Sequence, residues 1–258
     1  EYGNQTIDLN NRFRLFNLEQ NLIQNEGIVE ISPGISSMQI HYDNTKISVD
    51  ELVHTITQEH DAQDDVSNMT VPSRVVNLPI VLNDRWNLEA LKDYAQSIRS
   101  EAPYLPSNFD FVARNNGIDV ERLREIVLSA EYMVLGLGDV YLGCPAALPV
   151  DPRHRLVCPK FNPARTYVGV RYRKSRTHTH TQTNNNRYTP KGAVGIGGAF
   201  MCAYPLRSPG GYQLIGRSLP IWNMFEKGEN FTEPWLLRHF DRIRFHEVTH
   251  EELESQFD

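Results

Sequence analysis

The chain has 258 residues, of which 40% are hydrophobic, 10% aromatic and 22% charged. Its length exceeds the roughly 100–150 residues of an ordinary domain, so we expect two compact units. With 26 basic and 32 acidic residues the net charge is −6, which argues against binding to a phosphate backbone. No apolar run approaches the ~18–20 residues of a membrane span. The three cysteines, Cys144, Cys158 and Cys202, lack CxxC spacing and favour reduced thiols in a cytoplasmic protein.

Residues 1–82 predict a small α/β subdomain. Apolar residues recur every three or four positions from Phe13 to Ile23, which is typical of an amphipathic helix. Ser48, three residues before Glu51, fits the capping box of a second helix. Strands are expected at residues 28–31, 37–42 and 73–82. The resulting order α-β-β-α-β is that of a split βαβ, or ferredoxin-like, fold.

Residues 83–250 predict a helical segment followed by a β-barrel. Apolar spacing indicates three helices, near residues 88–95, 109–113 and 120–127, and Asp119 is a typical N-cap for the third. From Tyr132 onward, short apolar runs separated by Gly and Pro are typical of a closed sheet. We expect residues 251–258 to begin a linker. The predicted fold class is therefore α+β, with a ferredoxin-like α/β subdomain followed by a barrel.

Residues 168–187 (VGVRYRKSRTHTHTQTNNNR) interrupt this pattern. The segment has five basic residues, no acidic ones and almost no apolar side chains. Because such a composition buries too little surface to fold, we expect a disordered insertion. The HTHTH run within it is a weak candidate for a metal site, and we predict no metal.

Two charged side chains outside that insertion are candidates for catalysis. His154 can transfer a proton or bond a polar substrate, or it can simply satisfy a backbone carbonyl. Arg165 can bind a carboxylate through two parallel hydrogen bonds, or it can form a structural salt bridge. The chain contains no GxSxG motif and no Ser-His-Asp order, so nucleophilic hydrolysis has no support.

A glycine cluster at residues 195–198 raises the question of phosphate binding. It leads into an apolar strand rather than a helix, and no GxxxxGK[ST] motif occurs, which excludes a P-loop. Tight turns with positive φ explain the glycines, and their backbone N–H groups could instead hold an oxyanion. Tyr204, which follows this cluster, suits either the barrel core or a substrate contact.

Several motifs carry a resemblance to a known family: EYMVLGLGDVYLG, LPVDPRHRLVCPKFNPART, TPKGAVGIGGAF, YPLRSPGGYQLIGR and PWLLRHFDRIRF. The chain resembles the KipI-like half of a urea carboxylase carboxyltransferase domain. This family is also called allophanate hydrolase subunit 1 and is related to a component of the bacterial 5-oxoprolinase. The resemblance covers nearly the whole chain, and its GLGDVYLG and DPRHRL…NPART elements resemble the urea-carboxylase branch.

The resemblance implies a ferredoxin-like subdomain, a cyclophilin-like barrel and an active site shared with a KipA-like half. It implies carboxyl transfer from carboxybiotin to urea, giving allophanate. Biotin would be held by a carrier domain, and ATP and bicarbonate would be used at a separate biotin carboxylase domain. We expect these partners on the same polypeptide, since the chain begins at Glu1 and ends where the KipA-like half is expected. We therefore do not expect the chain to be active alone.

Candidate site residues follow from the same resemblance. Such a site must exclude water, hold the amides and carbonyl of urea, and stabilise an oxyanion. Side chains and backbone groups of suitable type are His154 and Arg165 for catalysis, and Asn162, Tyr204, Gly197, Gly198 and Asn223 for substrate binding.

The insertion departs from the resembling family, in which NPART runs through one aromatic residue to TP. Here Tyr167 and Tyr188 bracket extra sequence. We hypothesise that a retained intron encodes it. A transcript joining Thr166 to Thr189 through one tyrosine codon would support this origin, and uniform RNA coverage of the segment would contradict it.

Other functions remain open at this point. A KipI-like protein can be a regulatory kinase inhibitor, although the DPRHRL…NPART elements favour the enzyme. A carboxyltransferase of this kind can also act on 5-oxoproline or guanidine. A peptide-binding cyclophilin-like module rests on fold analogy alone.

Overall fold

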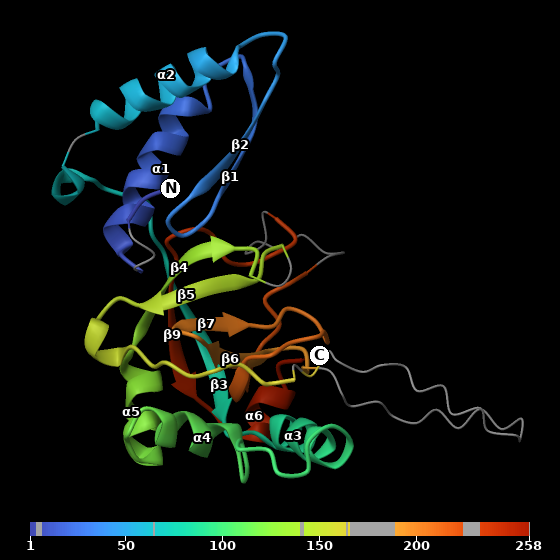
Figure 1. The fold of residues 1–258 in the computed structure, drawn as a ribbon. Helices are drawn as coiled ribbons and strands as arrows, with labels where there is room; N and C mark the ends of the chain where they lie inside the picture. The colour runs from blue at the N-terminus through green and yellow to red at the C-terminus, as the bar shows by residue number, and fades with distance from the viewer. Residues whose placement is uncertain are drawn as a thin grey trace, which may run out of the picture. The chain divides into compact units, whose positions relative to one another are not determined.

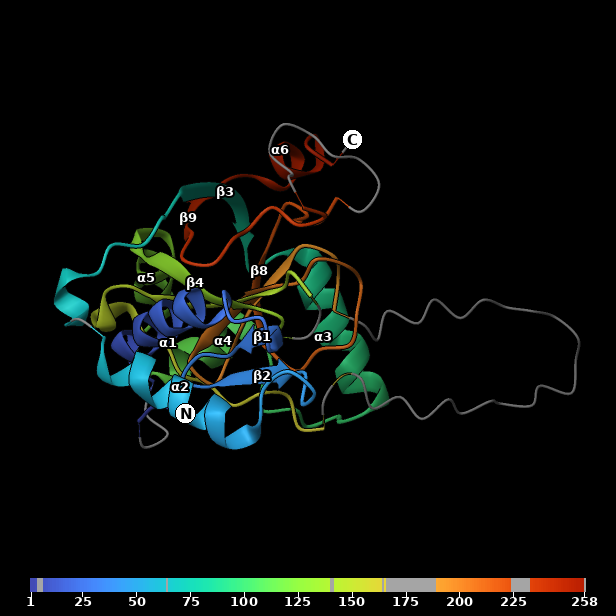
Figure 2. The same cartoon turned by 90° about the horizontal axis from the view of Figure 1, so that it is seen from above.

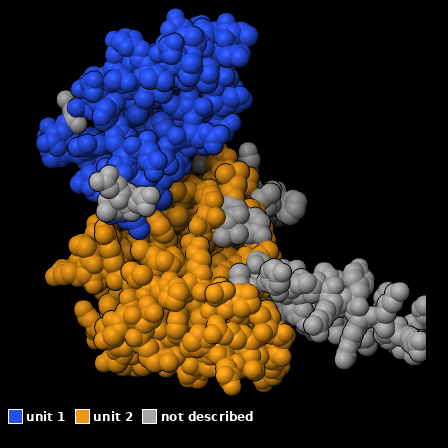
Figure 3. All heavy atoms as spheres, in the orientation of Figure 1, with its two compact units in different colours: residues 1–72 blue, residues 73–258 orange. Residues whose placement is uncertain are grey.

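The computed structural model describes residues 1–3, 7–63, 65–139, 142–163, 165, 189–223 and 233–257. The chain divides into two compact units, Glu1–Pro72 and Ser73–Asp258, which Figure 3 distinguishes by colour. The insertion expected at residues 168–187 lies outside the described residues. Among the described helices, none combines the length and apolar character needed to cross a membrane.

The first unit packs two helices on a two-stranded antiparallel sheet (Figure 1). Its elements are α1 (Leu9–Leu22), β1 (Ile28–Pro33), β2 (Met38–Tyr42), α2 (Val49–Asp61) and the short η1 (Val66–Asn68). The predicted capping box opens α2: the Ser48 hydroxyl accepts the Glu51 N–H, and the Glu51 carboxylate accepts the Ser48 N–H at 2.9 Å. A small core of Leu18, Leu22 and Ile31 joins the helices to the sheet.

The strand predicted at residues 73–82 forms, but it lies in the second unit. β3 (Val75–Leu82) pairs in parallel with β9 (Arg242–Glu247) and antiparallel with β8 (Gln213–Ser218). The first unit therefore ends at Pro72 and not at Leu82. Its described elements follow the order α-β-β-α, and the fifth element of the predicted pattern belongs to the barrel.

The second unit is a closed barrel in the strand order β3-β8-β6-β7-β5-β4-β9. The remaining strands are β4 (Glu131–Leu137), β5 (Pro145–Pro149), β6 (Ala193–Gly197) and β7 (Phe200–Ala203). The α+β fold class, with an α/β unit before a barrel, is thereby confirmed.

The three predicted helices also form, as α3 (Arg85–Ser97), α4 (Asn108–Asn115) and α5 (Val120–Ser129). Asp84, Ser107 and Asp119 cap them by accepting backbone N–H groups. All three lie on one side of the barrel (Figures 1 and 2). Residues 251–258 were expected to begin a linker, but the first of them belong to helix α6 (His250–Glu254), whose Leu253 is buried.

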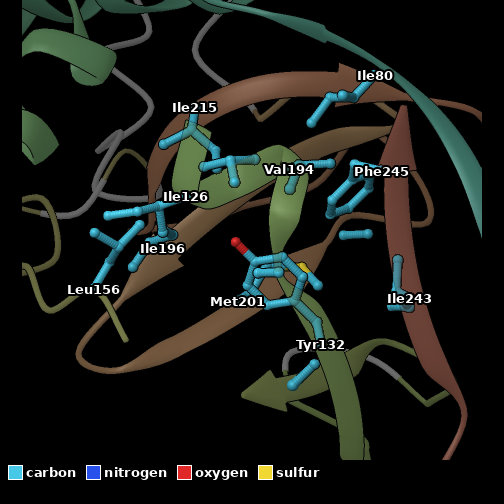
Figure 4. Close-up of a cluster of buried hydrophobic side chains, with 14 of the residues drawn as sticks. Ile80, Ile126, Tyr132, Leu156, Val194, Ile196, Met201, Ile215, Ile243 and Phe245 are labelled. Carbon is cyan, nitrogen blue, oxygen red and sulfur yellow. The ribbon is translucent and has the colours of Figure 1, made fainter. Parts of the chain in front are cut away.

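Aliphatic and aromatic side chains fill the barrel interior (Figure 4). Val194, Ile196 and Ile243 are at most 2% exposed. Tyr132 lies among them, and its phenol oxygen has no hydrogen-bond partner among the described residues. Burial raises the pKa of this phenol far above its usual range. The interior of the barrel is thus an apolar core that encloses the orphaned hydroxyl of Tyr132.

Candidate functional site

A buried arginine outside this apolar core is the most unusual charged group of the second unit. Arg165 is 1% exposed, and its guanidinium carbon lies 3.9 Å from the ring centre of Phe161. Its Nη2 donates to the carbonyl of Tyr212 at 2.8 Å and to the hydroxyl of Thr189 at 3.3 Å. Its Nε has no hydrogen-bond partner among the described residues.

No described carboxylate compensates the charge of Arg165. Burial lowers the pKa of its guanidinium to about 10, and the groups that partly oppose this shift are the phenols of Tyr204, Tyr94 and Tyr104. At neutral pH the side chain remains a cation. A buried cation that lacks an anionic partner is costly in a folded protein, so this position calls for a specific explanation.

Two hydroxyls of the same part of the barrel are also orphaned, those of Tyr204 and Ser208. Tyr204 is fully buried, and the backbone N–H of Tyr212 approaches its oxygen without closing a hydrogen bond. Burial raises the pKa of this phenol well above its usual range. Ser208 is 1% exposed, and its hydroxyl has no partner among the described residues.

The backbone brings these side chains together. Thr189 and Ser208 form an isolated antiparallel bridge, with N–H to carbonyl distances of 2.9 and 3.1 Å. A Cβ at Gly210 would clash with the Tyr204 phenol and lie 2.6 Å from Oγ1 of Thr189. Only glycine permits this approach. We refer to Arg165, Thr189, Tyr204, Ser208 and Gly210 as the Arg165 cluster.

An aromatic wall holds the loop that carries Arg165. The Tyr94 hydroxyl donates to the carbonyl of Pro163 at 2.9 Å, and the Tyr104 hydroxyl accepts the N–H of Asn162 at 2.8 Å. Nη1 of Arg99 donates to the carbonyl of Asn162 at 3.0 Å. Because helix α3 and the segment after it supply these groups, they fix the backbone that leads to Arg165.

Two cysteines lie beside the Arg165 cluster. The sulfur atoms of Cys144 and Cys202 are 3.0 Å apart, both thiols are free, and both residues are fully buried. Burial raises the pKa of the Cys202 thiol, and interactions with Cys144 and Asp139 raise it further. The Cys202 thiol is therefore protonated at neutral pH and adds no charge to the cluster.

The contacts given for the described residues do not link the other predicted site residues to this cluster. His154, in the short helix η2 (Pro152–His154), is half-buried, and its imidazole makes no hydrogen bond among the described residues. Asn162 is exposed and is held through its backbone. Asn223 donates its N–H to the carbonyl of Pro234 at 2.8 Å, beside residues 224–232, which lie outside the described part.

The glycine pair does not form the expected oxyanion site. The N–H of Gly198 already donates to the carbonyl of Cys158 at 2.8 Å, so it is not free to hold an oxyanion. Gly198 has a φ of +62° and serves as a turn residue. Gly197 is buried in β6, where a Cβ would clash with the Tyr212 ring. Both glycines thus have a structural reason to be present.

Sequence reasoning singled out Arg165 and Tyr204, whose roles stay predictions, but it did not single out their neighbours Thr189 and Ser208. Thr189 and Ser208 stand in the TP and SPGG motifs, so the signal was present in residues already singled out. The bridge that brings them together depends on barrel closure. Among the described residues, no group of three or more His, Cys, Asp or Glu side chains could hold a metal ion, and the HTHTH run lies outside them.

Comparison with known proteins places the chain in a family. The family model "Carboxyltransferase domain, subdomain C and D" matches residues 1–171 and 172–232. The chain belongs to this carboxyltransferase-domain family. A urea amidolyase of Lachancea kluyveri is 42% identical over 259 residues, which cover 98% of this chain and 13% of the relative.

Solved structures agree with this assignment. The crystal structure of the Kluyveromyces lactis urea carboxylase matches with a TM-score of 0.83 and 40% identity, over 100% of this chain and 21% of that one. A 5-oxoprolinase component of Escherichia coli O157:H7 is more distant, with 24% identity over 93% of this chain and 87% of the relative. The chain thus corresponds to a domain-sized part of its urea amidolyase relatives, whose polypeptides carry further domains.

Proposed function

We propose that the chain forms one half of the carboxyltransferase site of a biotin-dependent urea carboxylase, a ligase of urea degradation. The reaction transfers a carboxyl group from carboxybiotin to urea and gives allophanate. The observation that carries this proposal is the 42% identity to a urea amidolyase over 98% of the chain, against 24% to the 5-oxoprolinase component. The Arg165 cluster supports it as a polar site of suitable chemistry.

The residues of the Arg165 cluster fit a carboxylated group. The cluster offers one guanidinium and two orphaned hydroxyls, and no described carboxylate acts on Arg165, although that of Asp139 acts on the neighbouring Cys202. Biotin, carried on a separate domain of the same polypeptide, would supply the carboxyl group in activated form. A biotin carboxylase domain would use ATP and bicarbonate to charge it, and a KipA-like half would complete the site. We propose that the whole polypeptide is located in the cytoplasm.

The protein's own residues then have distinct tasks. Arg165 and Tyr204 would donate hydrogen bonds to oxygen atoms that carry negative charge, and such bonds are stronger where water is excluded. Phe161 stacks on the guanidinium and fixes its plane. Tyr94 and Tyr104 hold the preceding loop, so the donors are placed before the substrate arrives.

Reconstitution tests the reaction. The chain is combined with its KipA-like half, a biotin carboxylase and a biotinylated carrier, and product is followed with urea, 5-oxoproline and guanidine. Urea-dependent allophanate is expected, and a second preparation lacking residues 168–188 shows whether the insertion is tolerated. Product from 5-oxoproline or guanidine, but not from urea, would show that urea is not the substrate. An assembled complex that forms no product would favour the regulatory function.

His154 is a separate proposal, because no contact between described residues links it to the Arg165 cluster. The change His154→Ala is expected to reduce urea turnover while bicarbonate-dependent ATP cleavage at the biotin carboxylase domain continues. The exposed Arg122 of α5, changed to Gln, is the matched surface control. Unchanged urea turnover in His154→Ala would remove this residue from the site.

A further inference from the structure

We propose that the Arg165 cluster is a binding site for a small carboxylate, held by Nε of Arg165 and the hydroxyls of Tyr204 and Ser208. The family resemblance singles out Arg165 and Tyr204, but it assigns them no carboxylate and does not include Ser208. The presence of the anion site stands on the structure alone. Its identification with the carboxyl group that is transferred, or with the carboxylate of allophanate, rests on the proposed function.

The charge of Arg165 is the first argument. The half-exposed Arg74 of the second unit does have an acidic partner, because its Nε and Nη2 bind the 1%-exposed Asp241 at 3.0 and 2.5 Å. Arg217 likewise acts electrostatically on the buried Asp84. Arg165 is more deeply buried than either, yet its described partners are the Tyr212 carbonyl, the Thr189 hydroxyl and nearby phenols, all of them uncharged. An anionic ligand would supply the missing partner.

The orphaned atoms are the second argument. A purely structural role for Arg165 would be fulfilled by Nη2, which already bonds Tyr212 and Thr189. That role leaves Nε of Arg165, the Tyr204 hydroxyl and the Ser208 hydroxyl all buried without a partner among the described residues. Buried polar groups are nearly always hydrogen-bonded. The orphaned Nε of this buried cation, together with two orphaned hydroxyls, therefore indicates a ligand with several acceptor atoms.

The chemistry of these donors selects the ligand class. Nε of Arg165 offers one charged N–H to a carboxylate oxygen, and a hydroxyl can donate to the second oxygen. One cation with neutral hydroxyls balances a single negative charge, whereas a phosphate dianion would leave excess charge buried. The cluster therefore fits a planar monoanion such as formate, bicarbonate or the carboxylate of allophanate.

The probe is formate, titrated into the full 258-residue chain while the Nε–H resonance of Arg165 is followed by nitrogen-edited NMR. The resonance is assigned by its loss in Arg165→Lys. Formate is expected to shift it saturably, and chloride at equal ionic strength is not. The variants Tyr204→Phe and Ser208→Ala each lack one hydroxyl that donates to the charged ligand. Each should bind formate about tenfold or more weakly. Arg122→Gln should bind as the unchanged chain does.

The outcomes separate this site from the proposed function. A resonance insensitive to formate, or equal affinity in all variants, would overturn the carboxylate site even if reconstituted enzyme makes allophanate. Malonamate, a stable analogue of allophanate, provides the second arm. Binding of formate and malonamate supports both proposals. Binding of formate without malonamate keeps the carboxylate site and counts against allophanate as its occupant.

Discussion

The interior of the barrel and the Arg165 cluster both bury polar atoms that lack partners among the described residues, but the side chains around these atoms differ. Inside the barrel the single phenol of Tyr132 is surrounded by hydrocarbon side chains such as Val194 and Ile243. In the Arg165 cluster, two orphaned hydroxyls lie beside a buried guanidinium whose Nε is also orphaned. The first is an isolated defect of packing, and the second is a set of donors.

The contrast teaches how to interpret an unsatisfied buried group. One neutral hydroxyl in an apolar core costs about 1–3 kcal/mol and stabilises nothing in return. Several unpaired donors around a cation also destabilise the folded protein until a ligand accepts hydrogen bonds from them. Such donors make the site specific, because a ligand that lacks the matching acceptors leaves them unpaired. Substitutions that remove the donors should therefore affect function in the cluster and stability alone in the barrel.

Arg165→Met should have the largest effect on this contrast. Methionine keeps much of the apolar length but removes the charge and every donor. We expect carboxyl transfer to urea to fall by roughly 10²–10³-fold, as when a donor to a developing negative charge is lost. The free energy of unfolding should change by only about 1–2 kcal/mol, because replacing a buried charge with an apolar side chain is often close to neutral. A stable variant with full activity would contradict a catalytic role.

Asp84→Asn extends the contrast to a buried acid that has partners. Asp84 accepts from the N–H and side-chain amide of Asn87 at 3.0 and 2.5 Å, yet burial raises its pKa to about 6. Because this folded-state pKa lies above the unfolded value, the folded protein binds the proton more tightly. The stabilisation is complete below about pH 4 and is lost as the pH rises through about 6.

Asparagine at position 84 cannot titrate and can still cap α3. The variant should therefore gain roughly 2–3 kcal/mol relative to the unchanged chain between about pH 4 and pH 7. Thermal unfolding at both pH values measures this difference. If the difference in stability stays constant with pH, the Asp84 carboxyl does not titrate in this range.

Tyr132→Phe should have the smallest effect. Removing the orphaned hydroxyl leaves the ring in place, so the free energy of unfolding should rise by about 1 kcal/mol. Chemical unfolding monitored by circular dichroism would detect such a change. A loss of stability would show that the phenol has a partner in solution, which would weaken the contrast with the Arg165 cluster.

Local sequence patterns predicted the helices well, because their causes are local. The capping box at Ser48 and Glu51 and the N-cap at Asp119 are present in the structure. The strand at residues 73–82 was also predicted, but it was assigned to the first unit and lies in the second. Its parallel partner β9 stands near the opposite end of the chain, and no local pattern encodes that pairing.

The site was predicted in part, for a similar reason. Arg165 was singled out for its chemistry, and burial away from any described carboxylate adds weight to that choice. Gly198 was misjudged as an oxyanion donor, because its bond to the distant Cys158 is a tertiary contact. Ser208 was overlooked because a serine in a proline- and glycine-rich turn acquires meaning only when the barrel closes around it.

The most direct test of the contrast is urea-dependent allophanate formation in the reconstituted enzyme, measured side by side for Tyr204→Phe and Tyr132→Phe. Each variant removes one buried hydroxyl that has no partner among the described residues. We expect the rate to fall about tenfold for Tyr204→Phe, as for the loss of a hydrogen bond to a charged group. It should remain unchanged for Tyr132→Phe. Equal rates in the two variants would contradict the assignment of the Arg165 cluster as the site.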